Sequence, residues 1–390
     1  QANGRAKDWL IQLDTLIHGA RIKNLCINLK HMRFVTKMRC GYCMNNFSSQ
    51  FKIEDRKVGC NSPVYIIAEA GISHFGDEDK AYKLVDMAVS AGADAVKFQL
   101  VFADELATPD YIYYDLFKSL EMSTDIWKDA SNRIHDNGQK LYFDVFGFDS
   151  LDIAHNLSAD GVKLSTTEFY NRALIEQALS RFEKISISVG GIPADDIDLL
   201  VEQLLQEHSQ KICLMYGFQS EPTPLEKNNL LKLKSLKERY PVFELGFMDH
   251  SDGGSDDAFN LSLLAMGMGI SVIEKHLTLD RSLKIEDYVS GLAPDQFQKF
   301  VKLIRKYEPA LGSESLELSE LENEYRNKAA KSVVALKDLK KGQVLRPTDA
   351  VLKRTGTTGG GVPIRLLSDA LNRELKVNVK KDHPISQDQV

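Results

Sequence analysis

Short apolar runs recur through the middle of the chain, and a longer stretch with apolar residues every three or four positions follows most of them. Runs without polar alternation are typical of parallel strands that are covered on both faces. The longer stretches, for example 79–91, 124–138, 194–207 and 256–268, are typical of helices that cover such a sheet. The runs that predict strands lie at 64–70, 95–100, 141–146, 161–165, 185–189, 211–216, 243–249 and 272–277.

Repeated strand–helix units fill residues 61–308, and eight such units over about 250 residues are the size of a (β/α)8 TIM barrel. A doubly wound open sheet is the alternative that the same alternation allows. Residues 331–390 form a short mixed segment rich in turn signals. We therefore expect an α/β protein built on a TIM barrel, followed by a small β-rich C-terminal domain.

Changes of pattern along the chain predict its domain organisation. Residues 1–50 form a basic, weakly patterned extension, and a small hairpin at 51–60 opens the barrel domain of residues 51–310. Residues 311–330 are expected to form a charged, helical linker to the small domain of residues 331–390.

Ionisable residues stand inside or directly after most of the predicted strands, although these runs are otherwise apolar. A charge in such a place is costly unless it is paired or functional. The C-terminal strand ends of a TIM barrel converge on its active site, so we expect these side chains to line one cavity. They are Glu69 and His74, Lys97 and Gln99, Asp144, Lys163 with Thr166 and Glu168, Ser186 and Ser188, Tyr216, Asp249 and His250, and Glu274, Lys275 and His276.

The residue types in this set predict three tasks. Lysines beside hydroxyls suit a small phosphorylated or carboxylated anion, two histidines that end adjacent strands suit a divalent metal, and glutamates suit proton transfer. Asp249 and Glu274 fit either as ligands or as buried ion-pair partners, and the sequence leaves that open. The candidates are Lys97, Lys163, Thr166 and Ser188 for the anion, His250 and His276 for the metal, and Glu69 and Glu168 for proton transfer.

Composition and charge narrow the function classes. The 390 residues carry a formal net charge of −6, so general affinity for nucleic acid is not expected. No stretch reaches the roughly 18 apolar residues of a membrane span, and no membrane partner is expected. Four of the five cysteines fall in the first 60 residues, which is not the pattern of a disulfide framework, so we expect a reducing, cytoplasmic location.

The charged strand ends lie in six stretches with recognisable motifs. They are IAEAGISHFG at 67–76, ADAVKFQ at 93–99, KLSTTE at 163–168, ISVG at 187–190, DHSD at 249–252 and IEKHLTLD at 273–280. Together they resemble the sialic acid synthase family, also called the N-acetylneuraminate synthase family. The C-terminal segment resembles the antifreeze-like (SAF) domain of that family through KSVVA at 331–335, DLKKG at 338–342, KRTG at 353–356 and GGVP at 360–363. The likeness covers about residues 51–390.

The resemblance implies a transferase that joins phosphoenolpyruvate to an N-acetylmannosamine-like sugar, its 6-phosphate or a diacetamido-trideoxy hexose. The product would be a nine-carbon 2-keto acid, with release of phosphate. It also implies a divalent metal at His250 and His276, usually Mn²⁺ with Mg²⁺ or Co²⁺ as alternatives, and a homodimer in which the SAF domain of one subunit covers the active site of the other. The other implied roles are phosphoenolpyruvate binding by Lys97, Lys163, Thr166 and Ser188, substrate binding by Gln99, proton handling by Glu69 and Glu168, and sugar contacts by Asp287 and Arg354.

Several positions depart from the residues that are usual in the family. Asp144-Val145 stands where the third strand usually ends in a Ser/Thr-Pro pair, and an acid beside a phosphate would repel it. The sixth strand and its loop, residues 215–223, lack the usual His-Cys-Thr and Tyr-Pro, Ser73 replaces an asparagine, and Thr355 replaces the proline of Arg-Pro-Gly. These departures leave the reaction class intact and the acceptor sugar open.

Two other functions stay open at this point. One is a metal-dependent aldolase in which a lysine forms a Schiff base with pyruvate, and the other is a non-catalytic carbohydrate-binding relative. In the N-terminal extension, Cys40 and Cys43 would make a zinc site if Cys26 and Cys60 completed it, and the plainer interpretation is an extension without a metal.

Overall fold

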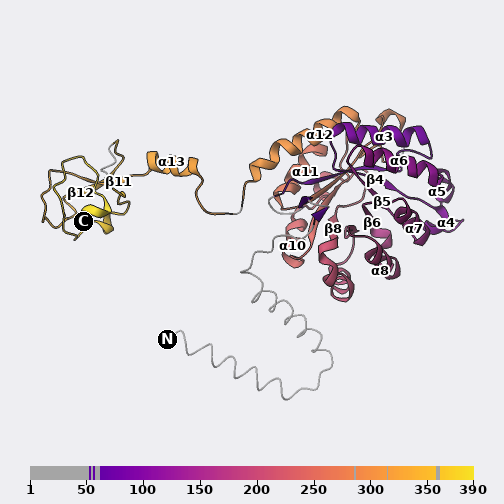
Figure 1. The fold of residues 1–390 in the computed structure, drawn as a ribbon, viewed down its shortest axis with the longest axis horizontal. Helices are drawn as coiled ribbons and strands as arrows, with labels where there is room; N and C mark the ends of the chain where they lie inside the picture. Colours follow the sequence, from indigo (N-terminus) through magenta and orange to yellow (C-terminus); the bar gives the residue numbers. More distant parts are fainter. Residues whose placement is uncertain (1–51, 54–55, 58–61, 285–286, 314, 357–360) are drawn as a thin grey trace, which may run out of the picture. The chain divides into compact units, whose positions relative to one another are not determined.

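Eight parallel strands form a closed barrel in the computed structural model, which describes residues 52–53, 56–57, 62–284, 287–313, 315–356 and 361–390 (Figure 1). The strands are β3 (Tyr65–Gly71), β4 (Ala95–Gln99), β5 (Lys140–Asp144), β6 (Gly161–Leu164), β7 (Ile185–Ser188), β8 (Ile212–Tyr216), β9 (Glu244–Asp249) and β10 (Val272–His276). Each pairs with the next along the chain, and β10 closes on β3 through Val272↔Tyr65 and His276↔Glu69. The closed order confirms the predicted TIM barrel and excludes the open doubly wound sheet.

Little of the chain before residue 62 is described. Of the predicted hairpin at 51–60, β1 (Lys52–Ile53) pairs antiparallel with β2 (Arg56–Lys57). The extension of residues 1–50 lies outside the described residues, and so do the cysteines of the zinc-site hypothesis, Cys26, Cys40, Cys43 and Cys60.

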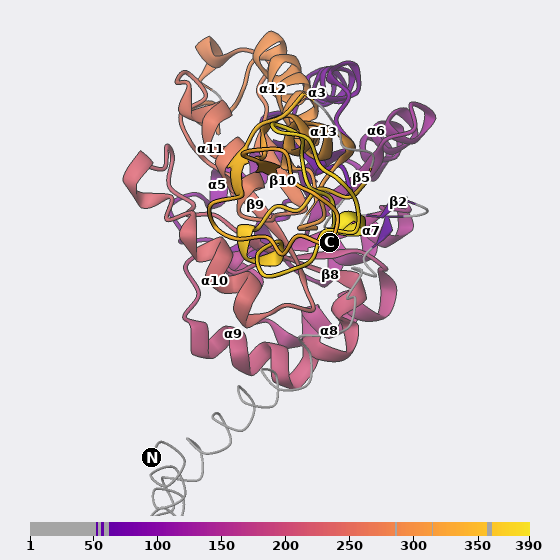
Figure 2. The ribbon, with the colours of Figure 1, turned by 90° about the vertical axis from the view of Figure 1, so that its left-hand side faces the viewer.

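Helices cover the outside of the barrel. They are α3 (Glu78–Ala91), α4 (Ala103–Leu106), α5 (Tyr114–Leu120), α6 (Thr124–Asp136), α7 (Phe148–Asn156), α8 (Arg172–Arg181), α9 (Ala194–Leu200), α10 (Leu231–Arg239), α11 (Asp257–Gly267) and α12 (Pro294–Tyr307). Helices α3 and α12 lie on the side of the barrel opposite α8, α9 and α10 (Figure 2). The predicted helix at 194–207 is interrupted, because α9 passes into a π-helical turn, Val201–Leu205, and then into a 3-10 segment, Gln206–Lys211.

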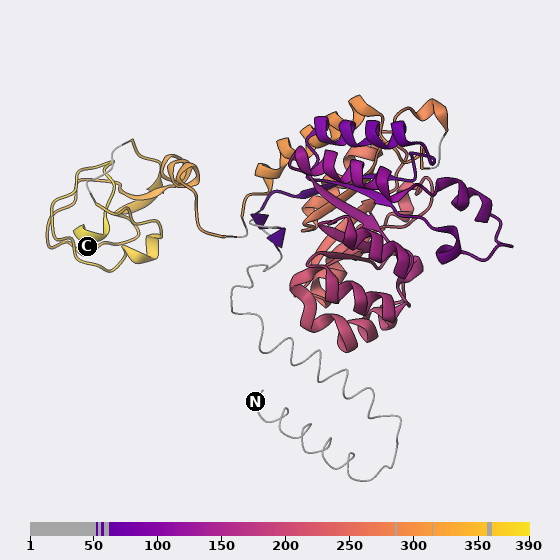
Figure 3. The ribbon, with the colours of Figure 1, turned by 45° about the vertical axis from the view of Figure 1, so that its right-hand side comes forward.

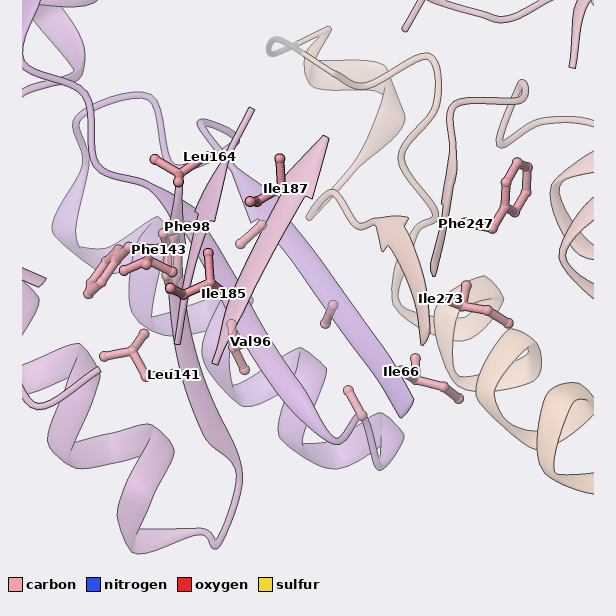
Figure 4. Close-up of a cluster of buried hydrophobic side chains, with 14 of the residues drawn as sticks. Ile66, Val96, Phe98, Leu141, Phe143, Leu164, Ile185, Ile187, Phe247 and Ile273 are labelled. Atoms are coloured by element: carbon pink, nitrogen blue, oxygen red, sulfur yellow. The ribbon is translucent and has the colours of Figure 1, made fainter. Parts of the chain in front are cut away.

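Alternate residues of each strand face either the helices or the interior of the barrel. Side chains on the helix side, such as Val96, Phe98, Phe143 and Ile187, belong to the large core between strands and helices (Figure 4). Most apolar residues that face inward come early in their strands, as Tyr65, Ala95 and Val272 do, and they fill one end of the interior, whereas Met215 and Met248 come late in β8 and β9. The inward apolar cluster consists of Tyr65, Ile67, Ala95, Tyr142, Cys213, Met215, Met248 and Val272.

Residues 313–390 form a second compact unit. It contains α13 (Glu320–Ala329) and an antiparallel pair of strands, β11 (Ser332–Ala335) and β12 (Ala350–Lys353), among loops that pack on a small apolar core (Figure 3). This is the small β-rich C-terminal domain that the sequence predicts. Among the described residues of both units, no helix is long and apolar enough to cross a membrane.

Candidate active site

A buried network of two lysines and three carboxylates lies inside the barrel toward the C-terminal ends of the strands. Lys97 Nζ lies 2.6 Å from Glu69 Oε2 and 2.5 Å from Asp144 Oδ2. Lys163 Nζ lies 2.6 Å from Glu274 Oε1 and 3.6 Å from Asp144 Oδ2. These residues belong to β3, β4, β5, β6 and β10, and β10 joins the four consecutive strands because it closes on β3. The structure therefore brings together both lysines and one glutamate of the predicted site.

The network contains one more carboxylate than ammonium group, and an unpaired buried charge is costly. Burial raises the pKa of Glu69 to about 8, and Lys97 offsets only part of that rise. Burial by itself would lower the pKa of Lys97, but Asp144, Glu274 and Glu69 hold it well above its ordinary value. Burial would likewise raise the pKa of Glu274, but Lys163 and Lys97 keep it below its ordinary value. At neutral pH, Glu69 is thus the group that holds a proton.

Several oxygens of this network have no hydrogen-bond partner among the described residues. They are Glu69 Oε2, Asp144 Oδ1 and Glu274 Oε2. Glu69 Oε2 lies 2.6 Å from Lys97 Nζ as an ion pair without hydrogen-bond geometry, and Glu274 Oε2 is 3.7 Å from the same nitrogen, which is too far for a hydrogen bond. Buried polar atoms in folded proteins nearly always have a partner, so unsatisfied ones mark a place where a ligand or water binds.

Two histidines stand beside this network. His276 ends β10, His250 directly follows β9, and their Nε2 atoms are 3.3 Å apart. Burial lowers the pKa of His250, and Lys163 lowers it further. Burial also lowers the pKa of His276 well below its ordinary value, and His250 adds to that effect. Both rings are therefore neutral at pH 7 and keep the lone pairs that a metal requires.

A third metal-ligand candidate, Glu221, lies in the loop after β8. Its carboxylate oxygen and one ring nitrogen each of His250 and His276 lie within 4.8 Å of one another. A set of two imidazoles and one carboxylate fits a divalent transition metal. The sequence analysis missed Glu221, because a glutamate in a loop carries no periodic signal. The loop reaches the site because Thr223 N donates a 2.8 Å hydrogen bond to His250 O.

Asp287 lies beside His276, as the resemblance to sialic acid synthases implies for a residue of the sugar site. Asp287 Oδ2 is 3.6 Å from His276 Nδ1, and neither atom has a hydrogen-bond partner among the described residues. Burial raises the pKa of Asp287 well above its ordinary value, and Glu221 raises it further. Gly71 makes room for this carboxylate, since a Cβ at that position would lie 3.0 Å from Asp287 Oδ2.

Two hydroxyl groups lie close together at the C-terminal ends of β6 and β7. Thr166 Oγ1 and Ser188 Oγ are 3.1 Å apart, and Thr166 Oγ1 donates to Gly190 O at 3.1 Å. Gly190 is required there by space, because a Cβ would lie 2.0 Å from Gly217 O. The close approach of these two loops positions the predicted hydroxyl pair.

Three predicted site residues are not joined to the lysine network. The Glu168 carboxylate accepts a 2.9 Å hydrogen bond from Asn171 Nδ2, and burial raises its pKa. Gln99 ends β4 and is half-buried. Arg354 lies in the second unit, where its Nε donates to Ala329 O at 2.9 Å.

Asp249 and Lys275 pair on the helix side of the barrel wall, so the expectation that charged strand-end residues line one site is wrong for Lys275, and Asp249 is a buried ion-pair partner, one of the two roles left open for it. Lys275 Nζ lies 3.2 Å from Asp249 Oδ2, and the hydroxyls of Ser251 and Ser262 donate to Asp249 at 2.5 and 3.0 Å. The alternation of side chains along β10 places Lys275 on the face opposite His276. Asp249 is an ion-pair partner on the side of α11.

His74 and Tyr216 also leave the cavity. The ring of His74 packs edge-on against Trp127, with centroids 5.3 Å apart, and burial lowers its pKa to about 4. The hydroxyl of Tyr216 donates to Asn228 O at 3.1 Å. His74 Nδ1 accepts a 3.0 Å hydrogen bond from Gly76 N, and both His74 and Tyr216 act as packed residues of the core.

Known proteins share this arrangement of fold and motifs. The NeuB family profile matches residues 84–315, and the SAF domain profile matches residues 330–390. The chain is 30% identical to the uncharacterized protein MJ1065 of Methanocaldococcus jannaschii over 87% of this chain and 98% of that one. It is 28% identical to the N,N'-diacetyllegionaminic acid synthase of Legionella pneumophila over 82% of this chain and 93% of that one.

Among solved structures, the N-acetylneuraminic acid (sialic acid) synthetase of Leptospira borgpetersenii, determined with citrate, superposes with a TM-score of 0.66. That likeness covers 72% of this chain and 96% of the other, at 28% identity. The matched profile covers more than half of the 390 residues and includes most of the barrel. The chain belongs to the NeuB family, and its relatives include proteins named as legionaminic acid and sialic acid synthases.

Proposed function

We propose that the protein condenses phosphoenolpyruvate with an N-acetylmannosamine-like sugar, its 6-phosphate or a diacetamido-trideoxy hexose, to give a nine-carbon 2-keto acid and phosphate. One observation carries this proposal: two buried ammonium groups and two neutral histidines meet at the same end of one barrel. Ammonium groups suit the anionic phosphoenolpyruvate, which is the donor, and histidines suit a metal that binds the sugar, which is the acceptor.

The donor is held by the lysines and the hydroxyl pair. Lys97 and Lys163 supply positive charge, and Thr166 and Ser188 supply hydrogen bonds to phosphate or carboxylate oxygens. Fixed positive charges in a site that excludes water also stabilise the charge that develops on departing phosphate. With Gln99 beside them, these residues form the donor half of the proposed site.

Proton transfer falls to the glutamates. Glu69 holds a proton at neutral pH, because burial raises its pKa to about 8. From its carboxyl group it donates that proton to the alkoxide that forms when C3 of phosphoenolpyruvate bonds to the aldehyde carbon. Glu168, whose pKa is also raised, accepts a proton from the water that adds at C2 before the C–O bond to phosphate breaks.

His250, His276 and Glu221 would hold a divalent metal, and the donor set fits one because both rings are neutral and His276 Nδ1 has no hydrogen-bond partner among the described residues. Mn²⁺ is the proposed ion, with Mg²⁺ or Co²⁺ as alternatives. When bound, it supplies Lewis-acid polarisation of the sugar aldehyde. Asp287, beside His276, is placed to accept hydrogen bonds from sugar hydroxyls.

We also propose a homodimer in which the C-terminal unit of one subunit covers the barrel of the other, so that Arg354 contacts the acyl-amino group of the sugar. The segments that follow five of the barrel strands expose aromatic side chains, and exposed apolar groups gathered on one face mark an interaction surface. They are Phe75, Tyr111, Tyr113, Phe148, Tyr170 and Phe218. Mixing Arg354→Ala with His276→Ala subunits tests the exchange, since a mixed dimer regains one complete site and two separate monomers regain none.

A panel assay tests the activity. Purified protein with Mn²⁺ should release phosphate from phosphoenolpyruvate only when an acylamino-hexose is also present, and mass spectrometry should detect the nine-carbon acid. His276→Ala should lose both the activity and the bound metal. No release with any sugar of the panel would overturn the proposal. Borohydride with pyruvate should trap no adduct, because the amino groups of Lys97 and Lys163 are held in buried ion pairs with carboxylates and so are poor Schiff-base nucleophiles.

A further inference from the structure

We infer that Asp144 is an internal anion that occupies the two donor-binding lysines and must be displaced by the donor, so that it sets how strongly the site binds an anion. The inference deepens the proposed function and rests on it, because it takes Lys97 and Lys163 as the donor-binding groups. Asp144 would then be a specificity-determining residue that contacts the ligand site.

The position of Asp144 in the barrel supports this role. It ends β5, the strand between β4, which carries Lys97, and β6, which carries Lys163. A single oxygen, Oδ2, lies 2.5 Å from Lys97 Nζ and 3.6 Å from Lys163 Nζ. Glu274, by contrast, approaches the two lysines with different oxygens. Asp144 Oδ2 therefore stands where one oxygen of a bound phosphate or carboxylate would contact both ammonium groups.

Asp144 is held only from one side. Its other oxygen, Oδ1, has no hydrogen-bond partner among the described residues, although the side chain is buried. Asp249 is equally buried, but Ser251 donates to one of its oxygens and Ser262 to the other. A carboxylate without such anchors can turn away when a stronger anion arrives, since rotation breaks no further hydrogen bond.

The charges of the network predict whether Asp144 strengthens or weakens the binding of an anion. Even with Glu69 protonated, the Asp144 and Glu274 carboxylates balance the two lysines, so an incoming phosphate meets a site that has no surplus of positive charge. An Asp144 charge about 5 Å from the phosphate weakens its binding by about 10- to 100-fold at an effective dielectric of about 25 to 50, between the value near a protein surface and that of bulk water. Removal of that charge should therefore tighten anion binding.

The experiment compares the wild type with Asp144→Asn, which keeps the shape and loses the charge, and with Asp144→Ser. Calorimetric titration of the full chain with phosphoenolpyruvate and with inorganic phosphate, in Mn²⁺, should give dissociation constants about 10- to 100-fold lower in both variants. Asp160→Asn is the matched control, because Asp160 pairs with Lys140 at 3.3 Å just before β6 begins, at the other end of the barrel. It should leave anion binding unchanged.

The outcomes separate this inference from the proposed function. If the wild type turns over phosphoenolpyruvate and both Asp144 variants bind it no more tightly, the inference is wrong and the proposed function stands. If no sugar supports turnover but the variants bind inorganic phosphate more tightly than the wild type, the inference stands and the proposed function is wrong. Circular dichroism of each variant establishes that it is folded before the titration.

Discussion

Two buried lysine–carboxylate networks lie on opposite faces of the barrel wall and differ in how their charges are matched. Outside, toward α11, Lys275 pairs with Asp249, and serine hydroxyls bond to both carboxylate oxygens. Inside, Lys97 and Lys163 face three carboxylates, and an oxygen on each carboxylate lacks a hydrogen-bond partner among the described residues.

The difference separates a structural ion pair from a functional one. A buried pair that is matched in charge and fully hydrogen-bonded has no capacity for a ligand. A network with one more carboxylate than lysine must hold a proton, and its unsatisfied oxygens can still bind a ligand. Both properties are expected of an active site. Burial alone did not distinguish the two, since all these side chains are almost completely buried.

The largest expected effect is on activity, from a change to the inner network. Lys163→Met should lower kcat/KM for the proposed condensation by at least about 10³-fold, or roughly 4 kcal/mol of transition-state stabilisation, because it removes a charge that would contact phosphoenolpyruvate in the proposed site. Steady-state phosphate release measures it. Lys184→Met, a half-buried lysine at the start of β7 whose Nζ donates to Gln210 O, is the control and should stay within a few-fold of wild type. Equal losses in both variants would contradict the assignment.

The next effect is on stability, from a change to the outer pair. Lys275→Met leaves Asp249 as an unpaired buried charge and should lower the free energy of unfolding by about 3–5 kcal/mol. Urea denaturation measures this. The double variant Asp249→Asn with Lys275→Met removes both charges and should recover most of the loss. If the single variant were as stable as the wild type, the outer pair would not be structural.

A pH dependence of stability should come from the inner network. The pKa of Glu69 is about 8 in the folded protein against an ordinary value of 4.5, so the folded state holds a proton that the unfolded chain releases between these values. Its contribution to stability is therefore complete below about pH 4.5 and is lost as the pH rises through about 8. Glu69→Gln cannot ionise and should show a flatter profile in urea unfolding from about pH 5 to pH 9. Identical slopes in both proteins would argue against a protonated Glu69.

The smallest effect comes from one hydrogen bond of the outer pair. Ser262→Ala removes the donor to Asp249 Oδ2 and should cost about 1 kcal/mol of stability, with kcat/KM unchanged. Thr166→Val, in the site, should do the reverse and weaken donor binding with little loss of stability. Thermal unfolding and KM for phosphoenolpyruvate measure the two changes. A change in KM for Ser262→Ala would show that the outer pair also shapes the site.

The strands were predictable because parallel strands covered on both faces need unbroken apolar runs, and each observed strand begins and ends within about two residues of its run. The interruption after α9 was not predictable. The change from an α-helical to a π-helical turn at Val201 reflects packing that no local pattern records. The period of two that places Lys97 and Gln99 on one face also separates Lys275 from His276. That alternation could have predicted that Lys275 points away from the site and forms an ion pair on the helix side.

The sequence determined that Glu69, Lys97, Lys163, His250 and His276 would gather at one end of a barrel, because strand order and strand direction fix where the ends of parallel strands meet. Tertiary structure decided which charges pair. The partners Lys97–Asp144 and Lys163–Glu274 are 47 and 111 residues apart, and Glu221 reaches the histidines through a loop. Distances of a few ångströms across a closed barrel depend on closure, strand register and loop path together, and these are properties of the packed chain that no single segment encodes.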